Sequence, residues 1–109
     1  RGSPISAMMS IQGMIAEIAS RVEAARWTTY RVAFLRERGN DVTMESAMAK
    51  LFVSRIAREV ADMSLQIHGA YGFTRDFKIE RIYRAAKEGE IVEGTSEIQR
   101  TIIANYILA

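Results

Sequence analysis

Cysteine is absent from the 109 residues of this sequence. Its absence excludes disulfide bonds, thiolate nucleophiles, zinc fingers and iron–sulfur clusters. Proline occurs once, as Pro4, and glycine only 7 times, so long uninterrupted helices are permitted. A chain without cysteine suits a reducing compartment, and we expect a cytoplasmic location, or the mitochondrial matrix in a eukaryote.

The sequence also lacks long apolar runs and a clear excess of charge of one sign. Hydrophobic residues make up 49% of the chain, but no apolar run approaches the roughly 20 residues of a membrane span. The 15 Lys and Arg residues nearly balance 13 Asp and Glu residues. Interspersed charges are typical of a solvated surface and not of a nucleic-acid-binding stripe. We therefore expect one globular domain that neither spans a membrane nor binds nucleic acid.

Apolar residues recur every three or four positions along most of the chain, which predicts helices. Ser3 and Pro4 predict the start of the first helix, because serine is a good N-cap and proline fits the first turn. Gly39-Asn40 predicts its end. Three further helices are expected: from Asp41 or Thr43 to about Gly69, from about Ile79 to about Gly89, and from Ser96 onward. Because no alternating pattern indicates a strand, the predicted fold is an all-α antiparallel four-helix bundle with two long and two shorter helices.

The segment before the last predicted helix reads IVEGTSEIQR, residues 91–100. Ser96 and Gln99 fit an S-x-x-Q capping box. Gly94 follows Glu93 and permits a backbone conformation, or a close approach by a ligand, that a Cβ would block. Helix N-termini attract anions and carbonyl groups, so Glu93 is a candidate functional carboxylate. The alternative is a solvated acidic cluster formed by Glu88, Glu90, Glu93 and Glu97.

His68 is the only histidine, and it gives little support for a metal site. A di-iron centre in a bundle needs Glu-x-x-His pairs, but Leu65 lies three residues before His68. Haem ligation by His68 and a methionine is the other metal alternative, although methionine is a common core residue. We expect no metal site and a hydrogen-bonded histidine at a helix end.

Two glycine-containing stretches, QIHGAYGFT at 66–74 and EIVEGTSEIQR at 90–100, closely resemble the C-terminal helical domain of the acyl-CoA dehydrogenases. The similarity continues through EAAR at 23–26, AMAKLF at 47–52 and IERIYR at 79–84, in the same order. It covers essentially the whole chain and implies a single domain over residues 1–109.

The resemblance implies FAD-dependent oxidation of an acyl-CoA thioester to a trans-2-enoyl-CoA. In this family a carboxylate removes the α-proton while the β-hydride passes to FAD, and the matching carboxylate is Glu93. Such a base must be close, dry and correctly aimed, because the α-proton is only weakly acidic. Gly94 would lie against the substrate. The matching FAD contacts are Thr95, Ser96 and Glu97, and, across a subunit interface, Gln66, Ile67, His68, Gly69 and Ala70.

The resemblance also implies a homodimer or tetramer, with an electron-transfer flavoprotein as the electron acceptor. Whole enzymes of the family carry an N-terminal helical domain and a middle β domain, which supply much of the acyl-CoA cleft. Neither domain is present in residues 1–109. Two hypotheses therefore remain open: a C-terminal domain of a dehydrogenase, or a non-catalytic helical oligomerisation module or split-enzyme part.

Overall fold

The computed structural model describes residues 2–109, so Arg1, the first residue of the expected domain, lies outside the described residues. Four α-helices make up most of the fold: α1 (Met9–Glu37), α2 (Thr43–His68), α3 (Ile79–Glu88) and α4 (Ser96–Leu108). Two short 3-10 helices accompany them: η1 (Ile5–Ala7) and η2 (Gly69–Phe73). The part of the chain that is described contains no strand, and the prediction of an all-α fold with two long and two shorter helices is confirmed.

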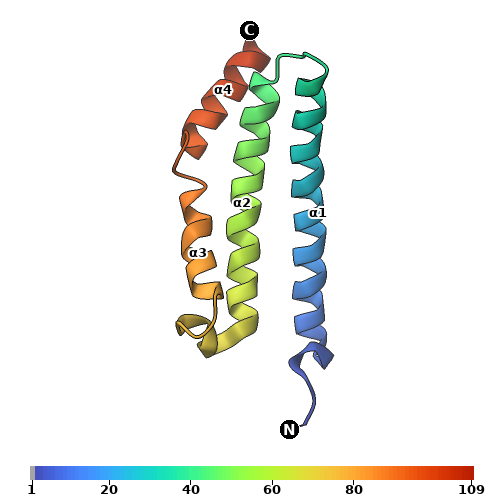
Figure 1. The fold of residues 1–109 in the computed structure, drawn as a ribbon, viewed down its shortest axis with the longest axis vertical. Coiled ribbons are helices and arrows are strands. Elements are labelled where there is room, and N and C mark those ends of the chain that lie inside the picture. The colour runs from blue at the N-terminus through green and yellow to red at the C-terminus, as the bar shows by residue number, and fades with distance from the viewer. Residues whose placement is uncertain (1) are drawn as a thin grey trace.

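Helix α2 lies at the centre of the fold. Helix α1 runs antiparallel along one side of α2, while α3 and α4 follow one another along its other side (Figure 1). Within residues 2–109, α1 packs against neither α3 nor α4. The helices therefore form an elongated layer, with extents of 60 × 24 × 23 Å, in which only α2 is flanked on two sides.

The face of α1 that meets α2 is a stripe with alternating spacings of three and four residues. Its less exposed positions are Ile11, Met14, Ile18, Arg21, Ala25, Thr28, Val32 and Leu35. This spacing is typical of antiparallel helices that pack at a shallow angle. Arg21 is accommodated in the stripe because its guanidinium pairs with Glu59 of α2. Ile15 and Val22 are also apolar, but they are 47% and 38% exposed because they lie beside this stripe.

The beginning of α1 differs from the prediction. Pro4 is the N-cap of the short turn η1, and Met8, with an extended backbone, separates that turn from α1. Gln12 Nε2 donates to the Ser6 carbonyl at 3.0 Å, which holds the turn against the first part of α1. The prediction that Ser3 and Pro4 start the long helix was therefore wrong, whereas the predicted starts of the other helices, Thr43, Ile79 and Ser96, are confirmed.

Few apolar residues are buried within the described part of the chain. The buried apolar residues are Ala25, Val42, Ala47, Ile56, Ala61 and Ile79. By contrast, Trp27, Tyr30 and Phe34 of α1 are exposed and lie together along one hollow. Exposed apolar patches of this kind mark contact surfaces. None of the helices described is both long and apolar enough to cross a membrane.

Candidate active-site loop

The connection between α3 and α4, residues 89–95, contains an unusual backbone conformation. Glu93 has φ 56°, and within residues 2–109 no other non-glycine residue has a positive φ. Gly94 follows with φ 91°. A residue with a Cβ is seldom found in the left-handed region, and the exceptions gather at turns and functional sites. The contacts around this loop must therefore hold Glu93 in place.

Glycine is required at Gly94 because of the backbone conformation and also because a side chain would have no space there. A Cβ at this position would lie 2.6 Å from Nε2 of Gln99. Gln99 is only 7% exposed, and its Nε2 donates to the Gly94 carbonyl at 3.3 Å and to the Glu93 carbonyl at 3.5 Å. The special backbone conformation predicted at Gly94 is thus confirmed, and its close neighbour within the chain is a side chain of α4, whereas the approach of a ligand stays a prediction.

The predicted capping box at the start of α4 was wrong. Thr95 is the N-cap, and its Oγ1 accepts a hydrogen bond from the Ile98 N–H at 3.4 Å. Thr95 has the extended backbone that an N-cap requires, with φ −62° and ψ 164°, whereas Ser96 is already helical. Gln99 is consequently one residue too far along α4 to close a capping box, and it binds the loop carbonyls instead.

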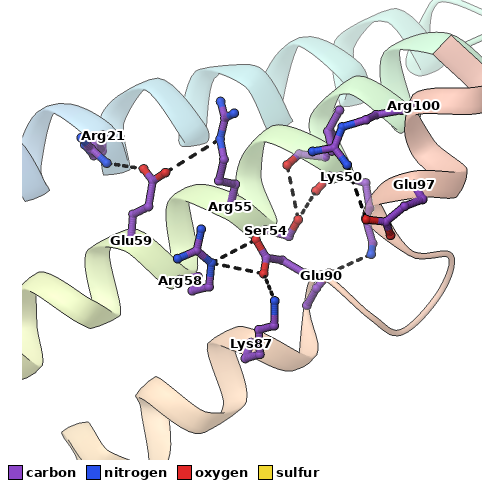
Figure 2. A network of polar contacts seen from close by, with 12 residues as sticks. Arg21, Lys50, Ser54, Arg55, Arg58, Glu59, Lys87, Glu90, Glu97 and Arg100 are labelled. Atoms are coloured by element: carbon purple, nitrogen blue, oxygen red, sulfur yellow. Dashed lines mark hydrogen bonds and ion pairs between the residues drawn. The ribbon is translucent and has the colours of Figure 1, made fainter. Parts of the chain in front are cut away.

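Glu90 anchors the beginning of the loop. Its carboxylate accepts hydrogen bonds from Lys87 Nζ at 2.6 Å and from Arg58 Nε at 3.1 and 3.2 Å (Figure 2). The hydrogen bond from Lys87, followed by that from Arg58, lowers the pKa of the Glu90 carboxyl. The Glu90 carbonyl also accepts the Ser96 N–H at 3.2 Å, so one residue ties the two ends of the loop together.

The members of the acidic cluster therefore differ in their surroundings. The Glu90 side chain is 13% exposed and belongs to two ion pairs. Glu97 is exposed and pairs with Arg100 at 3.7 Å. Glu93 is exposed, and its side chain forms no ion pair within residues 2–109. Glu90 is a structural carboxylate, whereas Glu93 is left with its charge available to a ligand.

A hollow of about 430 Å³ opens beside the loop at the N-terminus of α4. Its lining residues are Arg58, Lys87, Glu90, Ile91, Thr95, Ser96, Glu97 and Arg100. The hollow thus contains all three cofactor contacts expected near Glu93, namely Thr95, Ser96 and Glu97. Its three basic side chains outnumber the two acidic side chains with which they pair, Glu90 and Glu97, and together with the helix N-terminus they favour an anionic or hydroxyl-rich group here.

The second group of expected site residues lies elsewhere on the molecule. Gln66, Ile67 and His68 end α2, and Gly69 and Ala70 begin η2. Figure 1 places this turn at the opposite end of α3 from the Glu93 loop. Gln66 lines a hollow of about 430 Å³, and Ile67 and His68 line another of about 240 Å³. One copy of the chain therefore does not bring the two groups of residues into a single site.

The geometry of this turn explains two of its residues. Gly69 ends α2 with φ 59° and ψ −142°, a combination that is essentially restricted to glycine. His68 Nδ1 donates to the Ser64 carbonyl at 2.7 Å, and its ring packs edge-on against Phe77 at 5.6 Å. The predicted hydrogen bond of a helix-end histidine is thus present. Within residues 2–109, no cluster of three acidic or histidine side chains is arranged to hold a metal.

Three residues that hold the Glu93 loop were not identified from the sequence: Lys50, Arg58 and Gln99. Lys50, Ser54 and Arg58 are spaced by four residues on α2, and Figure 2 shows them along the side of α2 that faces the loop. These residues form a polar stripe on a helix that is otherwise apolar on two sides. Such a stripe predicts that this side of the helix makes a polar contact with another segment. Gln99 carried a signal too, but it was interpreted as a cap.

Comparisons with known proteins agree with this architecture. Residues 1–108 match the family model of the acyl-CoA dehydrogenase C-terminal domain. The chain is 46% identical, over 98% of its length, to acryloyl-CoA reductase (NADH) of Anaerotignum propionicum, and it covers 27% of that protein. The chain belongs to the acyl-CoA dehydrogenase family, as a C-terminal helical domain, and spans about a quarter of the length of such curated relatives.

Solved structures show the same fold. Butyryl-CoA dehydrogenase from Megasphaera elsdenii matches with a TM-score of 0.95 and 32% identity, over 99% of this chain and 28% of that chain. A chain from structural work on the electron transferring flavoprotein of Acidaminococcus fermentans matches with a TM-score of 0.94 and 39% identity, over 98% of this chain and 28% of that chain.

Proposed function

We propose that this chain is the C-terminal domain of an FAD-dependent acyl-CoA dehydrogenase in which Glu93 removes the α-proton of the acyl-CoA thioester. The observation that carries the proposal is the geometry of the loop. Glu93 is an exposed carboxylate on a left-handed residue, and side chains of α2 and α4 hold the backbone carbonyls of Glu93 and Gly94. Family membership supplies the reaction class.

The loop geometry suits a general base. A left-handed non-glycine residue costs about 1–3 kcal/mol, which the surrounding hydrogen bonds must offset. Because the backbone is held in this way, the side chain of the base leaves the loop in a fixed direction, and accurate aim is worth orders of magnitude in rate. Since no ion pair neutralises Glu93 within the described residues, its carboxylate is free to accept a proton.

The backbone around Glu93 supports the same assignment. Within residues 2–109 the Glu93 N–H donates to no acceptor, so it can donate to the thioester carbonyl. A donor at this place stabilises the negative charge that develops on the carbonyl oxygen as the α-proton leaves. Gly94, the residue after Glu93, would lie against the substrate, as the resemblance to the family implies.

The residues around the loop fit FAD. Thr95, Ser96 and Glu97 would contact it at the basic hollow beside α4, where hydroxyl and N–H groups meet phosphate or ribose oxygens. The segment from Gln66 to Ala70 would contact FAD from a second subunit, which accounts for its distance from Glu93 in one chain. When bound, FAD would supply the acceptor for the β-hydride.

The partners follow from the exposed surfaces and from the relatives. The apolar faces of α1 and η2 support a homodimer or tetramer. The similarity to a chain from work on an electron transferring flavoprotein supports a flavoprotein of that kind as the electron acceptor. The acryloyl-CoA reductase relative supports a second direction of the same chemistry, in which Glu93 returns a proton to the α-carbon.

The test is Glu93→Gln in an enzyme of the relatives' full length that carries this domain. Flavin bleaching by acyl-CoA in a single turnover should slow by about 10²–10⁴-fold. Bound FAD should remain at the wild-type level, because the substitution preserves the size of the side chain. Glu88→Gln, an exposed carboxylate at the end of α3, is the matched control and should bleach at the wild-type rate.

Two results would contradict the proposal. Near wild-type bleaching by the Glu93→Gln enzyme would remove Glu93 from the role of base. A wild-type enzyme that assembles as a colourless oligomer and ignores both FAD and acyl-CoA would favour the non-catalytic oligomerisation module.

A further inference from the structure

We infer that Lys50 is a positioning residue for Glu93, an inference that rests on the proposed function. The side chain of Lys50 extends from α2 to both ends of the segment that carries Glu93. Its Nζ donates to the Gly89 carbonyl at 2.7 Å and to the Gly94 carbonyl at 2.8 Å. One ammonium group thereby fixes the distance between the end of α3 and the residue that follows Glu93.

The chemistry of this contact requires a group with several donors and a charge. Carbonyls at the end of a helix carry partial negative charge, and Gly89 is the C-cap of α3. A lysine ammonium offers three donors and no acceptor, so it can serve two carbonyls at once. Hydrogen bonds from a charged donor are also stronger than neutral ones. Lys50 is half-buried between α2 and the loop, which strengthens both contacts.

The neighbouring contacts do not replace Lys50. Gln99 also donates to the Gly94 carbonyl, but at the longer distance of 3.3 Å and from α4. Ser54, one turn after Lys50 on α2, lies against Gly89 without a hydrogen bond to it, since its hydroxyl donates to the Lys50 carbonyl at 2.7 Å. Without Lys50, the strained backbone at Glu93 and Gly94 would be held from the α4 side only.

Lys50 acts through the backbone, because its hydrogen bonds go to carbonyls on either side of Glu93 and not to the Glu93 carboxylate. Its loss should therefore misdirect the base without removing it. Proton abstraction should become slower, while the binding of acyl-CoA, which depends largely on the other domains, should change little. A residue that only stabilises the fold would lower flavin content and rate together.

The experiment compares Lys50→Met with the wild type in the full-length flavoenzyme, with Lys78→Met as a control that removes an exposed lysine before α3. Single-turnover flavin reduction at saturating acyl-CoA should fall by about 10- to 100-fold in Lys50→Met. The Kd for acyl-CoA, the FAD content and the oligomer mass should stay close to wild type. The kinetic isotope effect of deuterium at the α-carbon should rise more than that at the β-carbon.

Lys50→Arg should recover part of the rate, and Lys78→Met should equal wild type.

Wild-type rates and isotope effects in a folded, FAD-loaded Lys50→Met enzyme would overturn the inference. If Lys50→Met loses FAD or folds poorly, Lys50→Gln, which retains a shorter amide donor, decides the question by the same isotopic signature. Loss of FAD or fold in both variants would establish a structural role and also overturn the inference. Glu93→Gln in the same enzyme separates the two proposals: an active Glu93→Gln refutes the proposed function, whereas an inactive Glu93→Gln with an unaffected Lys50→Met refutes only the role of Lys50.

Discussion

The two glycine-containing connections on either side of α3 are held in different ways. Residues 69–78, before α3, rely on ring packing: Phe77 lies 5.6 Å from His68 and 5.9 Å from Tyr71, measured between ring centroids. Tyr71 and Phe73 nevertheless remain 69% and 82% exposed. Residues 89–95, after α3, are held by polar side chains from α2 and α4, which bind the backbone carbonyls and Glu90.

One copy of the chain can hold the loop at residues 89–95 by itself, but it leaves the aromatic connection at residues 69–78 uncovered. Hydrogen bonds from α2 and α4 place the Glu93 backbone without help from another molecule. The aromatic connection presents large apolar rings to its surroundings, as a surface does when another protein covers it. Glu93, the proposed base, therefore belongs to a preorganised loop, whereas the turn after α2 presents an apolar surface of the kind that marks a contact with a partner.

Apart from the loss of Glu93 itself, Gly94→Ala should produce the largest effect, because it breaks the preorganised loop from within. An alanine at φ 91° is strained. Its Cβ would lie 2.6 Å from Nε2 of Gln99 and would displace that amide. We expect single-turnover flavin reduction in the full-length enzyme to fall by about 10²-fold. Gly13→Ala is the matched control, since a Cβ at Gly13 of α1 meets no atom within 4 Å and alanine favours a helix. Equal rates for the two variants would show that the loop does not depend on its left-handed backbone.

Glu90→Gln should loosen the loop by a smaller, pH-dependent amount. Lys87 and Arg58 lower the pKa of Glu90 in the folded state, so the carboxylate stabilises the loop at any pH above its unfolded pKa of about 4.3. This stabilisation is lost as the pH falls through the lowered folded pKa. We expect the wild-type Ser96 N–H, bonded to the Glu90 carbonyl, to lose protection from hydrogen exchange in acid, relative to its intrinsic rate.

The Glu90→Gln variant should lack this acid dependence. At neutral pH its loop should be less stable by about 1 kcal/mol, which lowers the protection of the Ser96 N–H from hydrogen exchange by about fivefold. Glu23→Gln, which breaks an exposed pair with Arg26 on α1, should change neither quantity. An acid dependence that survives in Glu90→Gln would assign the effect to another carboxylate.

The sequence predicted the helices better than their packing. Thr43, Ile79 and Ser96 were identified as helix starts because a break in the periodicity coincides with loop residues at each place. Pro4 misled, because its fixed φ suits the extended residue that precedes a 3-10 turn as well as the first turn of an α-helix. The apolar stripe of α1 could not reveal which of its edges faces α2, since apolar residues cover more than one side of that helix.

The candidate site was predictable only in part, for a similar reason. Glu93 and Gly94 are adjacent in the sequence, and a glycine beside a carboxylate before a helix is a local signal. Lys50 lies 44 residues from Gly94, so their contact depends on which face of α2 the loop meets. The polar stripe of Lys50, Ser54 and Arg58 indicates that this side of α2 makes a polar contact, but it does not identify the segment that is contacted, because α2 is covered on two sides.

Phe73→Ser should have the smallest effect on the chain by itself, and it sharpens the contrast between the two connections. Phe73 is largely exposed, so its loss should change the free energy of unfolding by less than about 0.5 kcal/mol, measured by urea titration of the 109-residue chain. Phe77→Ser is the matched comparison and should cost about 1 kcal/mol or more, because Phe77 packs against two rings. In the full-length enzyme, Phe73→Ser should weaken assembly, observed as a lower mass in solution at dilute concentration. Equal destabilisation of the isolated chain by both variants would show that Phe73 stabilises the turn internally and is not reserved for a partner.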